Sequence, residues 1–330
     1  MAIAISILDL APIGGGQTAR ESFEVSVELA RAAERTGYVR VWYAEHHNMP
    51  VIASSATSVV IGYVAAHTER IRLGAGGIML PNHSPLVIAE QFGTLGTLYP
   101  GRIDLGLGRA PGSDQNTMLA LRRDNSSADT FPQDVLELSG YLTGHSRIPG
   151  VEAVPRPVEP VPLYILGSSL FGAQLAAQLG LPYAFASHFA PDALHQAVDV
   201  YRSAFRPSEQ LAAPYVIAGV NVFAADSYET AEDQRVRAYR SRTRSFITRG
   251  NRGANFTDAE IDEFLASPAG LGLANMTKYT AVGTPVEVRE YLLKFAAEAG
   301  ADEVITAHHA SSVADRVRSV ELTGEIMNAS

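Results

Sequence analysis

Short apolar segments alternate with longer amphipathic segments along the whole chain. The short segments read as nearly continuous apolar runs, which is typical of strands buried on both faces. The longer segments are amphipathic, which is typical of helices that pack on one side. The predicted strands are Ile3–Leu8, Val39–Tyr43, Ile71–Ile78, Ile103–Leu107, Leu163–Leu166, Tyr183–Ala186, Tyr215–Phe223 and Glu303–Ala307. The predicted helices are Glu21–Thr36, Ser55–His67, Leu86–Tyr99, Asp134–Leu142, Phe171–Leu179, Ala193–Phe205, Tyr228–Ile247, Val286–Glu298 and Val313–Met327.

This alternation predicts an α/β protein in which crossover helices join parallel strands. Eight such strands in 330 residues favour a (β/α)8, or TIM, barrel over an open sheet. No linker or change of composition divides the chain, so residues 1–330 are expected to form a single domain. Two excursions interrupt the spacing, Arg109–Gln133 after the fourth strand and Thr248–Thr280 after the seventh helix. Both exceed the usual loop length, and we expect a lid, foremost at 248–280.

Composition narrows the chemistry that the chain can carry. The absence of cysteine excludes disulfides, cysteine-ligated zinc, iron–sulfur clusters and cysteine nucleophiles. The net charge of −9 disfavours nucleic-acid binding, which needs a basic face. The arginine run between Arg235 and Arg249 follows acidic residues and is interpreted as a solvated helix face.

The sequence predicts neither a membrane-spanning segment nor a signal peptide. No apolar run reaches the roughly 18 residues that a membrane span needs. The first residues, Met1–Ile5, carry no basic group and do not form a signal peptide. We therefore expect a cytoplasmic protein that does not associate with membranes.

In a barrel of this type, functional sites form where the strands end at their carboxyl side. The second strand is followed by Glu45, His46 and His47. Adjacent residues of an extended segment point to opposite faces, so His46 and His47 are poorly placed to bind one metal ion, and no metal site is predicted. We prefer a role in hydrogen bonding or acid–base catalysis. A structural, hydrogen-bonded corner is the alternative.

Glycines follow or interrupt the third and fourth strands. Gly76 and Gly77 indicate either a flat surface for a planar ring system or close packing against a helix. Arg109 stands among glycines at the end of the fourth strand. An arginine there suits a phosphate or carboxylate, and a surface ion pair is the alternative.

The end of the fifth strand predicts an anion site. Gly167, Ser168 and Ser169 precede a helix that opens at Leu170. Free backbone N–H groups, the helix dipole and two hydroxyls meet at that point. Simple capping of the helix by either serine is the alternative.

Histidines also gather at the ends of the predicted strands. His188 follows the sixth strand, and His308 and His309 follow the eighth. With Leu8 at the end of the first strand, His188 and His308 are predicted to line a substrate pocket.

One motif is treated as a coincidence. Residues Gly14–Ala19 match the Gly-x-Gly-x-x-Ala dinucleotide fingerprint. That fingerprint functions where glycines turn directly from strand to helix, whereas Asp9–Ile13 intervenes here. We predict a loop at this position.

Together these features resemble the bacterial-luciferase-like flavin-dependent oxidoreductases. The stretches that carry the resemblance are Thr36-Gly37-Tyr38 through Trp42, Glu45-His46-His47, Leu73-Gly74-Ala75-Gly76-Gly77-Ile78-Met79-Leu80-Pro81 and Gly101-Arg102-Ile103-Asp104-Leu105-Gly106-Leu107-Gly108-Arg109. Later matches are Gly167-Ser168-Ser169, Ala176-Ala177-Gln178-Leu179-Gly180-Leu181-Pro182 and Val282-Gly283-Thr284-Pro285.

The resemblance implies an FMN-binding barrel that receives reduced flavin from a separate NAD(P)H:flavin reductase. Such an enzyme forms a peroxyflavin with O2 and oxidises a small organic substrate. By position, His46 of the triplet Glu45-His46-His47 matches the catalytic histidine, and Gly76-Gly77 match a pair joined by a cis peptide beneath the flavin. Arg109 and Gly167 to Leu170 match the flavin phosphate site. A homodimer is also implied.

One departure and three alternatives complete the prediction. Gly108 stands where luminescent relatives carry a reactive cysteine, so the resemblance implies a non-luminescent, single-subunit type. A deazaflavin-dependent oxidoreductase of the same superfamily and a non-catalytic flavin-binding barrel remain open. A metal-dependent hydrolase barrel is disfavoured by the spacing of the ligands.

Overall fold

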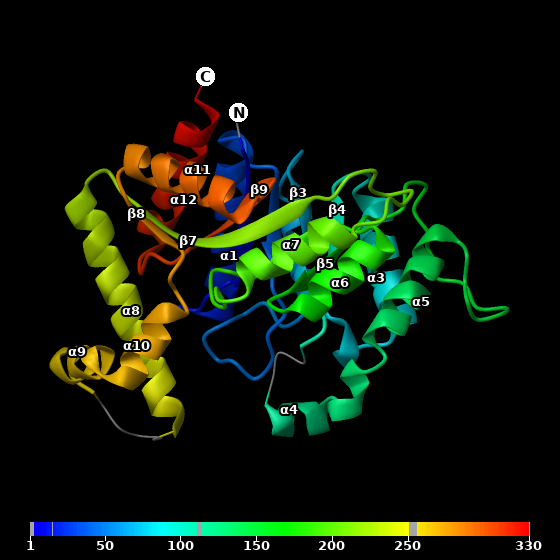
Figure 1. Ribbon diagram of the computed structural model, residues 1–330, viewed down its shortest axis with the longest axis horizontal. Coiled ribbons are helices and arrows are strands. Elements are labelled where there is room, and N and C mark those ends of the chain that lie inside the picture. The colour runs from blue at the N-terminus through cyan, green and yellow to red at the C-terminus, as the bar shows by residue number, and fades with distance from the viewer. Residues whose placement is uncertain (1–2, 15, 111–113, 251–255, 330) are drawn as a thin grey trace.

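Eight parallel strands close into a barrel in the computed structural model, which describes residues 3–14, 16–110, 114–250 and 256–329 (Figure 1). Each strand pairs with the next along the chain, and β9 pairs with both β7 and β1 to complete the ring. The barrel strands are β1 (Ala4–Asp9), β2 (Arg40–Tyr43), β3 (Arg72–Met79), β4 (Ile103–Gly108), β5 (Leu163–Gly167), β6 (Tyr183–Phe185), β7 (Val216–Ala224) and β9 (Glu303–His308). The predicted barrel class and all eight predicted strands are confirmed.

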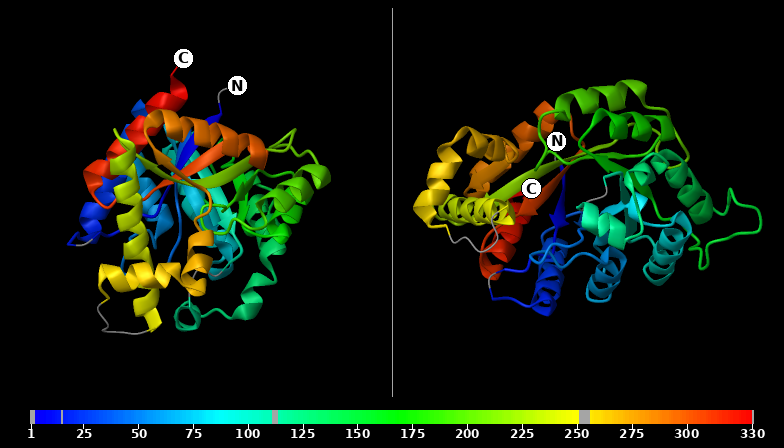
Figure 2. Two further views of the ribbon diagram at one scale, coloured as in Figure 1. Left: turned by 60° about the vertical axis from the view of Figure 1, so that its left-hand side comes forward. Right: turned by 90° about the horizontal axis from the view of Figure 1, so that it is seen from below.

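Helices surround the barrel on its outer side (Figure 2). They are α1 (Ala19–Arg35), α2 (Thr57–Ala65), α3 (Pro85–Leu98), α4 (Gln115–Ala120), α5 (Phe131–Thr143), α6 (Leu170–Leu179), α7 (Leu194–Ala204), α8 (Tyr228–Gly250), α9 (Asp258–Ala266), α10 (Pro268–Asn275), α11 (Pro285–Ala299) and α12 (Val313–Asn328). Two short 3-10 helices, η1 (Leu80–Asn82) and η2 (Asn125–Ala128), follow β3 and α4.

Local signals set the helix ends. Thr18 and Glu21 form a reciprocal capping box at the start of α1. At the end of α6, Gly180 adopts φ +65°, and a Cβ there would lie 2.5 Å from the Arg206 carbonyl oxygen. Because β1 ends at Asp9 and α1 begins at Ala19, Gly14 does not turn directly from strand to helix; Gly15 lies outside the described residues.

A ninth strand, β8 (Thr280–Gly283), was not predicted. It pairs only with the far end of β7, where Asn221 lies opposite Thr280, and so it extends the sheet outside the ring. Its four residues alternate in burial, and Thr280 is the last residue of a predicted excursion. Thr280 and Gly283 leave only Ala281 and Val282 as an apolar run, which is too short to indicate a buried strand.

Both predicted excursions contain helices. The first holds α4 and η2, and the second holds α9 and α10; residues 111–113 and 251–255 of these excursions lie outside the described residues. Arg240 and Arg244 of α8 pair with Asp258 and Asp262 of α9, which ties the second excursion to α8. In Figure 1, α4, α9 and α10 all lie on the lower side, opposite the two chain ends. Their action as a lid stays a prediction.

The middle of the barrel interior is an apolar layer. Inward-facing side chains form a cluster of their own, which includes Leu8, Trp42, Tyr164, Ile217 and Ile305. The rings of Trp42 and Tyr164 meet edge to face, with centroids 5.0 Å apart. The larger core lies between the strands and the helices.

A buried ion network fills the end of the barrel interior where the strands begin. Arg40, at the start of β2, donates to both carboxylate oxygens of Glu303 at 3.0 and 3.1 Å. It also donates to Asp104 at 2.8 Å and to the Tyr164 hydroxyl at 2.7 Å. Arg40 is 6% exposed, and both carboxylates are fully buried.

The two carboxylates collect further donors from other strands. Asp104 accepts from Trp42 Nε1 at 3.1 Å and from Arg72. Glu303 accepts from the Tyr215 hydroxyl at 2.7 Å and from Ser6. The network therefore connects six strands, which are β1, β2, β3, β4, β5 and β9, and it fills this end of the barrel.

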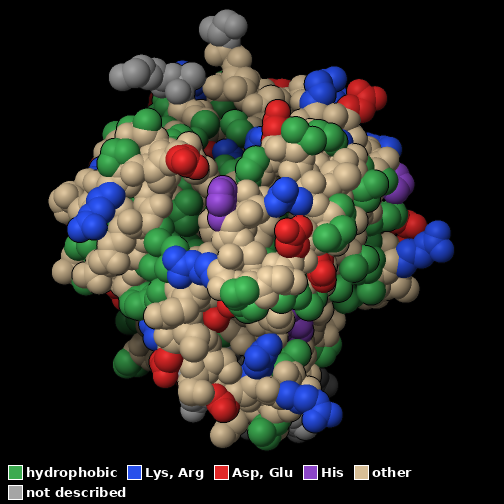
Figure 3. All heavy atoms as spheres, turned by 90° about the vertical axis from the view of Figure 1, so that its right-hand side faces the viewer, with side chains coloured by type: hydrophobic (Ala, Val, Ile, Leu, Met, Phe, Trp, Pro, Cys, Tyr) green, Lys and Arg blue, Asp and Glu red, His purple; other side chains and the backbone are tan. Residues whose placement is uncertain are grey.

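The outer surface carries mixed charge. The face in Figure 3 has basic and acidic side chains interspersed, with no large area of one sign. Among the described residues, no helix combines the length and apolar character that crossing a bilayer requires.

The ion network generates the first prediction. Arg40→Met is expected to lower the free energy of unfolding by about 3–5 kcal/mol, because it leaves two buried carboxylates without their shared cation. Arg20→Met is the control, since Arg20 pairs with Glu24 on the surface and its side chain is 88% exposed. The control is expected to change stability by less than about 1 kcal/mol. Equilibrium unfolding in urea measures both, and similar losses in the two variants would contradict the prediction.

Candidate active site

A cavity of about 1300 Å³ opens at the end of the barrel where the strands finish. Every barrel strand or its following loop contributes to the wall, as do α6, α8 and α10. The volume exceeds the roughly 300–1,000 Å³ of common ligand pockets. The cavity therefore has room for a large cofactor together with a second molecule.

Most of the predicted cofactor-binding residues line this cavity. Gly76, Gly77, Arg109 and the loop Gly167 to Ser169 contribute to its wall. Leu170 is not among the described residues that line it. It is the first residue of α6 and packs against the main core.

Gly76 and Gly77 are required by close packing. The peptide bond between them is cis, as the resemblance implies. A Cβ at Gly76 would lie 2.8 Å from Trp42 Cβ and 2.9 Å from Leu8 Cδ1. A Cβ at Gly77 would lie 2.8 Å from the Gly106 carbonyl oxygen on β4. Packing alone thus excludes a side chain at either position, and it leaves bare backbone facing the cavity.

One end of the cavity is built for an anion. Ser169 precedes α6 in an extended conformation, and its side chain makes no capping hydrogen bond. The first backbone N–H groups of α6 are therefore not capped by Ser169 and can donate to a bound anion, in line with the anion prediction. Phe171 lies in the first turn of α6, and the Arg109 guanidinium stacks on its ring, 4.2 Å from the ring centroid. Arg109 also donates to the Ala128 carbonyl at 3.3 Å and pairs with no carboxylate among the described residues.

The triplet after β2 divides between two environments. His46 lines the cavity, whereas Glu45 and His47 do not. Glu45 is 1% exposed and accepts from His47 at 2.7 Å, from His83 at 2.9 Å and from the Met79 N–H at 3.0 Å. Glu45 and His47 therefore hold the loop that carries His46, and only His46 can reach a bound molecule.

The carboxylate of Glu45 is ionised. Burial raises its pKa, but the hydrogen bonds from His47 and His83 outweigh burial and lower it to about 2. The same bond from Glu45 raises the pKa of His47. Ligand atoms of Glu45, His47 and His83 lie within 4.8 Å of one another, as in a metal site. Hydrogen bonding between both imidazoles and one carboxylate already accounts for this proximity.

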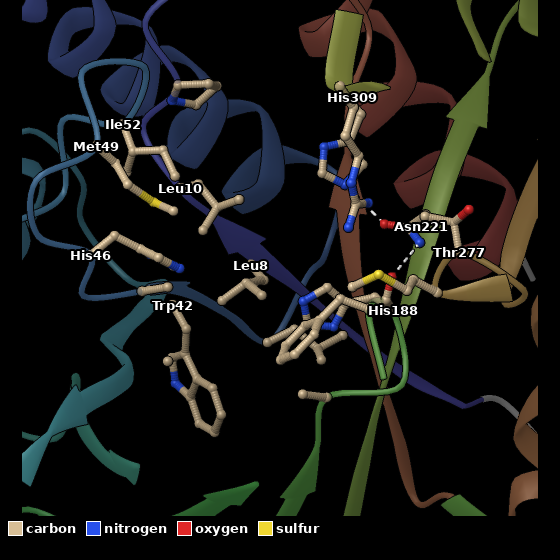
Figure 4. A pocket seen from close by; sticks show the side chains of 18 of the residues that line it. Leu8, Leu10, Trp42, His46, Met49, Ile52, His188, Asn221, Thr277 and His309 are labelled. Atoms are coloured by element: carbon tan, nitrogen blue, oxygen red, sulfur yellow. Dashed lines mark hydrogen bonds between the residues drawn. The ribbon is translucent and has the colours of Figure 1, made fainter. Parts of the chain in front are cut away.

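His46 and three other groups face one another across the cavity (Figure 4). His46 projects from one side, and His188, Asn221 and His309 lie on the other, with Leu8 between them. Burial lowers the pKa of His46, and its Nδ1 is buried without a hydrogen-bond partner among the described residues. His46 is therefore a neutral imidazole at neutral pH.

Asn221 fixes the protonation pattern of His309. Its amide nitrogen donates to the His188 carbonyl at 2.7 Å, so its oxygen is left to accept from His309 Nε2 at 2.9 Å. Neutral His309 then carries its proton on Nε2 and has an unprotonated Nδ1. Burial, followed by the nearby Arg242, lowers the pKa of His309 to about 4.

His188 is held against the barrel wall. A Cβ at Gly219 would lie 2.4 Å from its Nδ1, so the glycine in β7 makes room for this ring. Burial is the main cause that lowers the pKa of His188 to about 3. Its Nδ1 is buried and has no hydrogen-bond partner in the described part of the chain.

His308 and Leu8 complete the predicted substrate pocket. Both line the cavity. His308 Nδ1 bonds to Ser319 at 2.8 Å and Nε2 to Thr306 at 3.1 Å, so neither ring nitrogen is left for a ligand. His308 contributes its ring surface, and Leu8 its side chain.

Three functional candidates were missed from the sequence. Asn221 is a buried polar residue inside an otherwise apolar strand, and that contrast was a usable signal. His83 meets Glu45 only through the turn after β3. Arg242 lies within the arginine run interpreted as a solvated face, yet it lines the cavity. Nothing in the spacing separates it from its neighbours.

The pairing of Glu45 and His47 generates the second prediction. His47 is expected to titrate above its ordinary value of 6.5 and His46 below it, as followed by imidazole NMR signals. Glu45→Gln is expected to lower the His47 midpoint, since the neutral amide no longer favours the imidazolium. Protonated His47 stabilises the fold below its unfolded-state pKa, and this contribution is lost as pH rises through the raised folded-state value.

Glu24→Gln, on the exposed face of α1, is the matched control and should leave both midpoints in place. An unchanged His47 midpoint in Glu45→Gln would show that the carboxylate does not set its protonation.

Comparisons with known proteins agree with this geometry. A family model described as luciferase-like monooxygenase matches residues 3–303. A luciferase-like monooxygenase of Escherichia coli (strain K12) is 51% identical over 328 residues, which cover 98% of this chain and 97% of that protein. The crystal structure of apo-MsnO8 is 35% identical with a TM-score of 0.88, and the match covers 99% of each chain.

A fourth comparison concerns the fold alone. The oxygenating constituent of 3,6-diketocamphane monooxygenase from Pseudomonas putida, a type II Baeyer–Villiger monooxygenase solved with FMN, is 17% identical. Its TM-score is 0.71, and the match covers 98% of this chain and 97% of that one. The full-length match to the family model and the 51% identity decide the assignment. This chain belongs to the luciferase-like monooxygenase family.

Proposed function

We propose that this chain is a two-component monooxygenase that uses reduced FMN and O2 to oxidise a small organic substrate. The reduced FMN is delivered by a separate NAD(P)H:flavin reductase. The observation that carries the proposal is the anion-binding end of the cavity, where Arg109, which has no carboxylate partner among the described residues, stacks on Phe171 in the first turn of α6. The phosphate of FMN matches this end in charge and in its need for several donors.

The rest of the cavity fits the remainder of FMN. Gly76 and Gly77 belong to β3, which lies between β2, followed by His46, and β4, followed by Arg109, and their bare backbone suits a flat ring. The wall around it is largely apolar, with Leu8, Trp42 and Leu166 among its members. The type II Baeyer–Villiger monooxygenase of the same fold holds FMN, which adds support.

Bound reduced FMN would supply the electrons that activate O2. The protein would hold the phosphate with Arg109 and the α6 N-terminus, and it would place the ring against Gly76 and Gly77. Water must be kept away from such a reaction. Ala128 of η2 and Leu273 of α10 line the cavity, so the two excursions supply the cover, and we propose that they act as its lid.

His46 is the group proposed to manage a proton at the reacting end. Its neutral ring can accept or donate one hydrogen bond toward the cavity. Its neighbours Glu45 and His47 bind each other, and Glu45 also accepts from the Met79 N–H, which fixes the loop that carries His46.

The third prediction tests the cofactor. Purified protein titrated without oxygen is expected to bind reduced FMN, and oxygen is then expected to reoxidise the bound flavin more slowly than free flavin. Arg109→Gln is expected to weaken the binding of reduced FMN by about 10- to 100-fold, since one charge-assisted contact to the phosphate is lost. The same variant should bind reduced riboflavin, which has no phosphate, as the wild type does.

Flavin absorbance measures both steps. Weak binding of reduced FMN, or reoxidation at the rate of free flavin, would overturn the FMN monooxygenase and favour a deazaflavin reductase or a non-catalytic binder. The same titration with a reduced deazaflavin separates those two.

The fourth prediction tests His46. His46→Ala is expected to retain reduced FMN within about threefold but to reoxidise it faster and release more hydrogen peroxide. The phosphate contacts remain while proton control at the reacting end is lost. His145→Ala, on the exposed turn after α5, is the control. This role would be ruled out if His46→Ala reoxidised flavin at the wild-type rate and released the wild-type amount of hydrogen peroxide.

A further inference from the structure

Among the described residues of the cavity wall, the permanently charged side chains are all positive. Among the described residues that line it are three arginines and four histidines, but no aspartate, glutamate or lysine. The chain as a whole carries a net charge of −9, and the face in Figure 3 mixes both signs. An all-positive lining in an acidic protein therefore marks the cavity as a place for anions.

The three arginines lie at two opposite ends. Arg109 follows β4 and belongs to the proposed phosphate site. Arg242 lies on α8, which follows β7, and Arg316 lies in the first turns of α12, which follows β9. In the ring of eight strands, β4 and β9 are four positions apart and hence face each other. One phosphate bound at Arg109 leaves the far end uncompensated.

Arg242 differs from the other arginines of its helix. Arg235 pairs with Glu232, Arg237 with Asp233 at 2.7 Å, Arg240 with Asp262 at 2.6 Å, and Arg244 with Asp258 at 2.5 Å. Arg242 makes no ion pair or hydrogen bond within the described residues. Arg242 is exposed and lines the cavity, so its guanidinium is free to contact a molecule that binds there.

The groups around Arg242 do not neutralise it. His188 and His309 are close enough for its charge to lower the pKa of each, and both are neutral. Arg316 is 5% exposed, and its Nε and Nη2 have no hydrogen-bond partner among the described residues. Its nearest carboxylate, Asp9, is 4.0 Å away and already accepts from Ser26 at 2.6 Å and the Ala11 N–H at 2.9 Å.

Resting on the proposed function, we propose that the substrate is an apolar molecule with a carboxylate, which Arg242 binds at the end of the cavity opposite Arg109. A carboxylate matches a single planar guanidinium with two parallel hydrogen bonds. The cavity wall across from His309 is apolar and includes Leu10, Met49 and Ile52 (Figure 4). The carboxylate thus anchors one end of the substrate, while its apolar part reaches toward His46.

Matched acids and amides test this inference. The probes are ω-phenylalkanoates with two to six carbons in the acid chain and the corresponding carboxamides, which differ in charge but hardly in shape. Binding to wild-type protein is measured by calorimetry, with reduced FMN bound under anaerobic conditions and again without flavin. At least one acid is expected to bind about 10- to 100-fold tighter than its amide.

Variants on the same helix identify the residue. Arg242→Gln is expected to remove the preference for acids, and Arg242→Lys to retain part of it. Arg237→Gln, which alters an exposed and paired arginine, is the control and should keep the full preference. Circular dichroism confirms that each variant is folded.

Each outcome decides. Equal binding of acids and amides by the wild type, binding of amides only, or no binding of any acid would overturn the inference, as would an undiminished preference in Arg242→Gln. The ratio of reduced FMN to reduced riboflavin affinity should be unchanged in Arg242→Gln. Loss of that ratio would place the flavin phosphate at Arg242 and overturn the inference. A wild type that prefers acids but does not bind reduced FMN would overturn the proposed function alone.

Discussion

The buried pairing of Arg40 with Asp104 and Glu303 is the constraint on which the site depends. It fills the barrel interior where the strands begin, with each carboxylate shared among donors from several strands. Moving charges out of water is unfavourable unless every group is bonded, and here each has close partners. Because this end is closed by charge and by the apolar layer of Trp42 and Tyr164, space remains only where the strands finish.

The same geometry explains why distant segments build one site. Parallel strands deliver all their carboxyl ends to one rim, so His46, Asn221 and His309 meet although β2, β7 and β9 are far apart in sequence. The rim is not uniform. Residues after β4 and β5 offer donors to an anion, while those after β7 and β9 offer neutral imidazoles and further arginines. The kind of polar group that a part of the cavity offers thus depends on which strands end there.

Much of the fold was predictable because strand and helix periodicities are strong over many residues, as in β3 and α1. β8 was missed because Thr280 and Gly283 leave only two apolar residues between them, whereas the comparably short β2 and β6 are richer in apolar residues. For the site, position at the strand ends indicated Arg109 and the triplet Glu45-His46-His47, and the family resemblance singled out His46. Partnerships were not predictable: His83 reaches Glu45 through a turn, and Arg242 differs from Arg240 only in which way its position on α8 faces. Spacing encodes the face of an element, but not which residue from another element meets it.

Three neutral histidines and the permanently charged arginines give the part of the cavity around His309 a charge that changes little with pH. The pKa of His188 is about 3, that of His308 about 3 and that of His309 about 4, all lowered mainly by burial. Between pH 5 and 9 these rings therefore gain no charge, and the positive potential comes from the arginines alone. Asn221 sets the tautomer of neutral His309. In the proposed function, anion binding and proton handling therefore belong to different side chains.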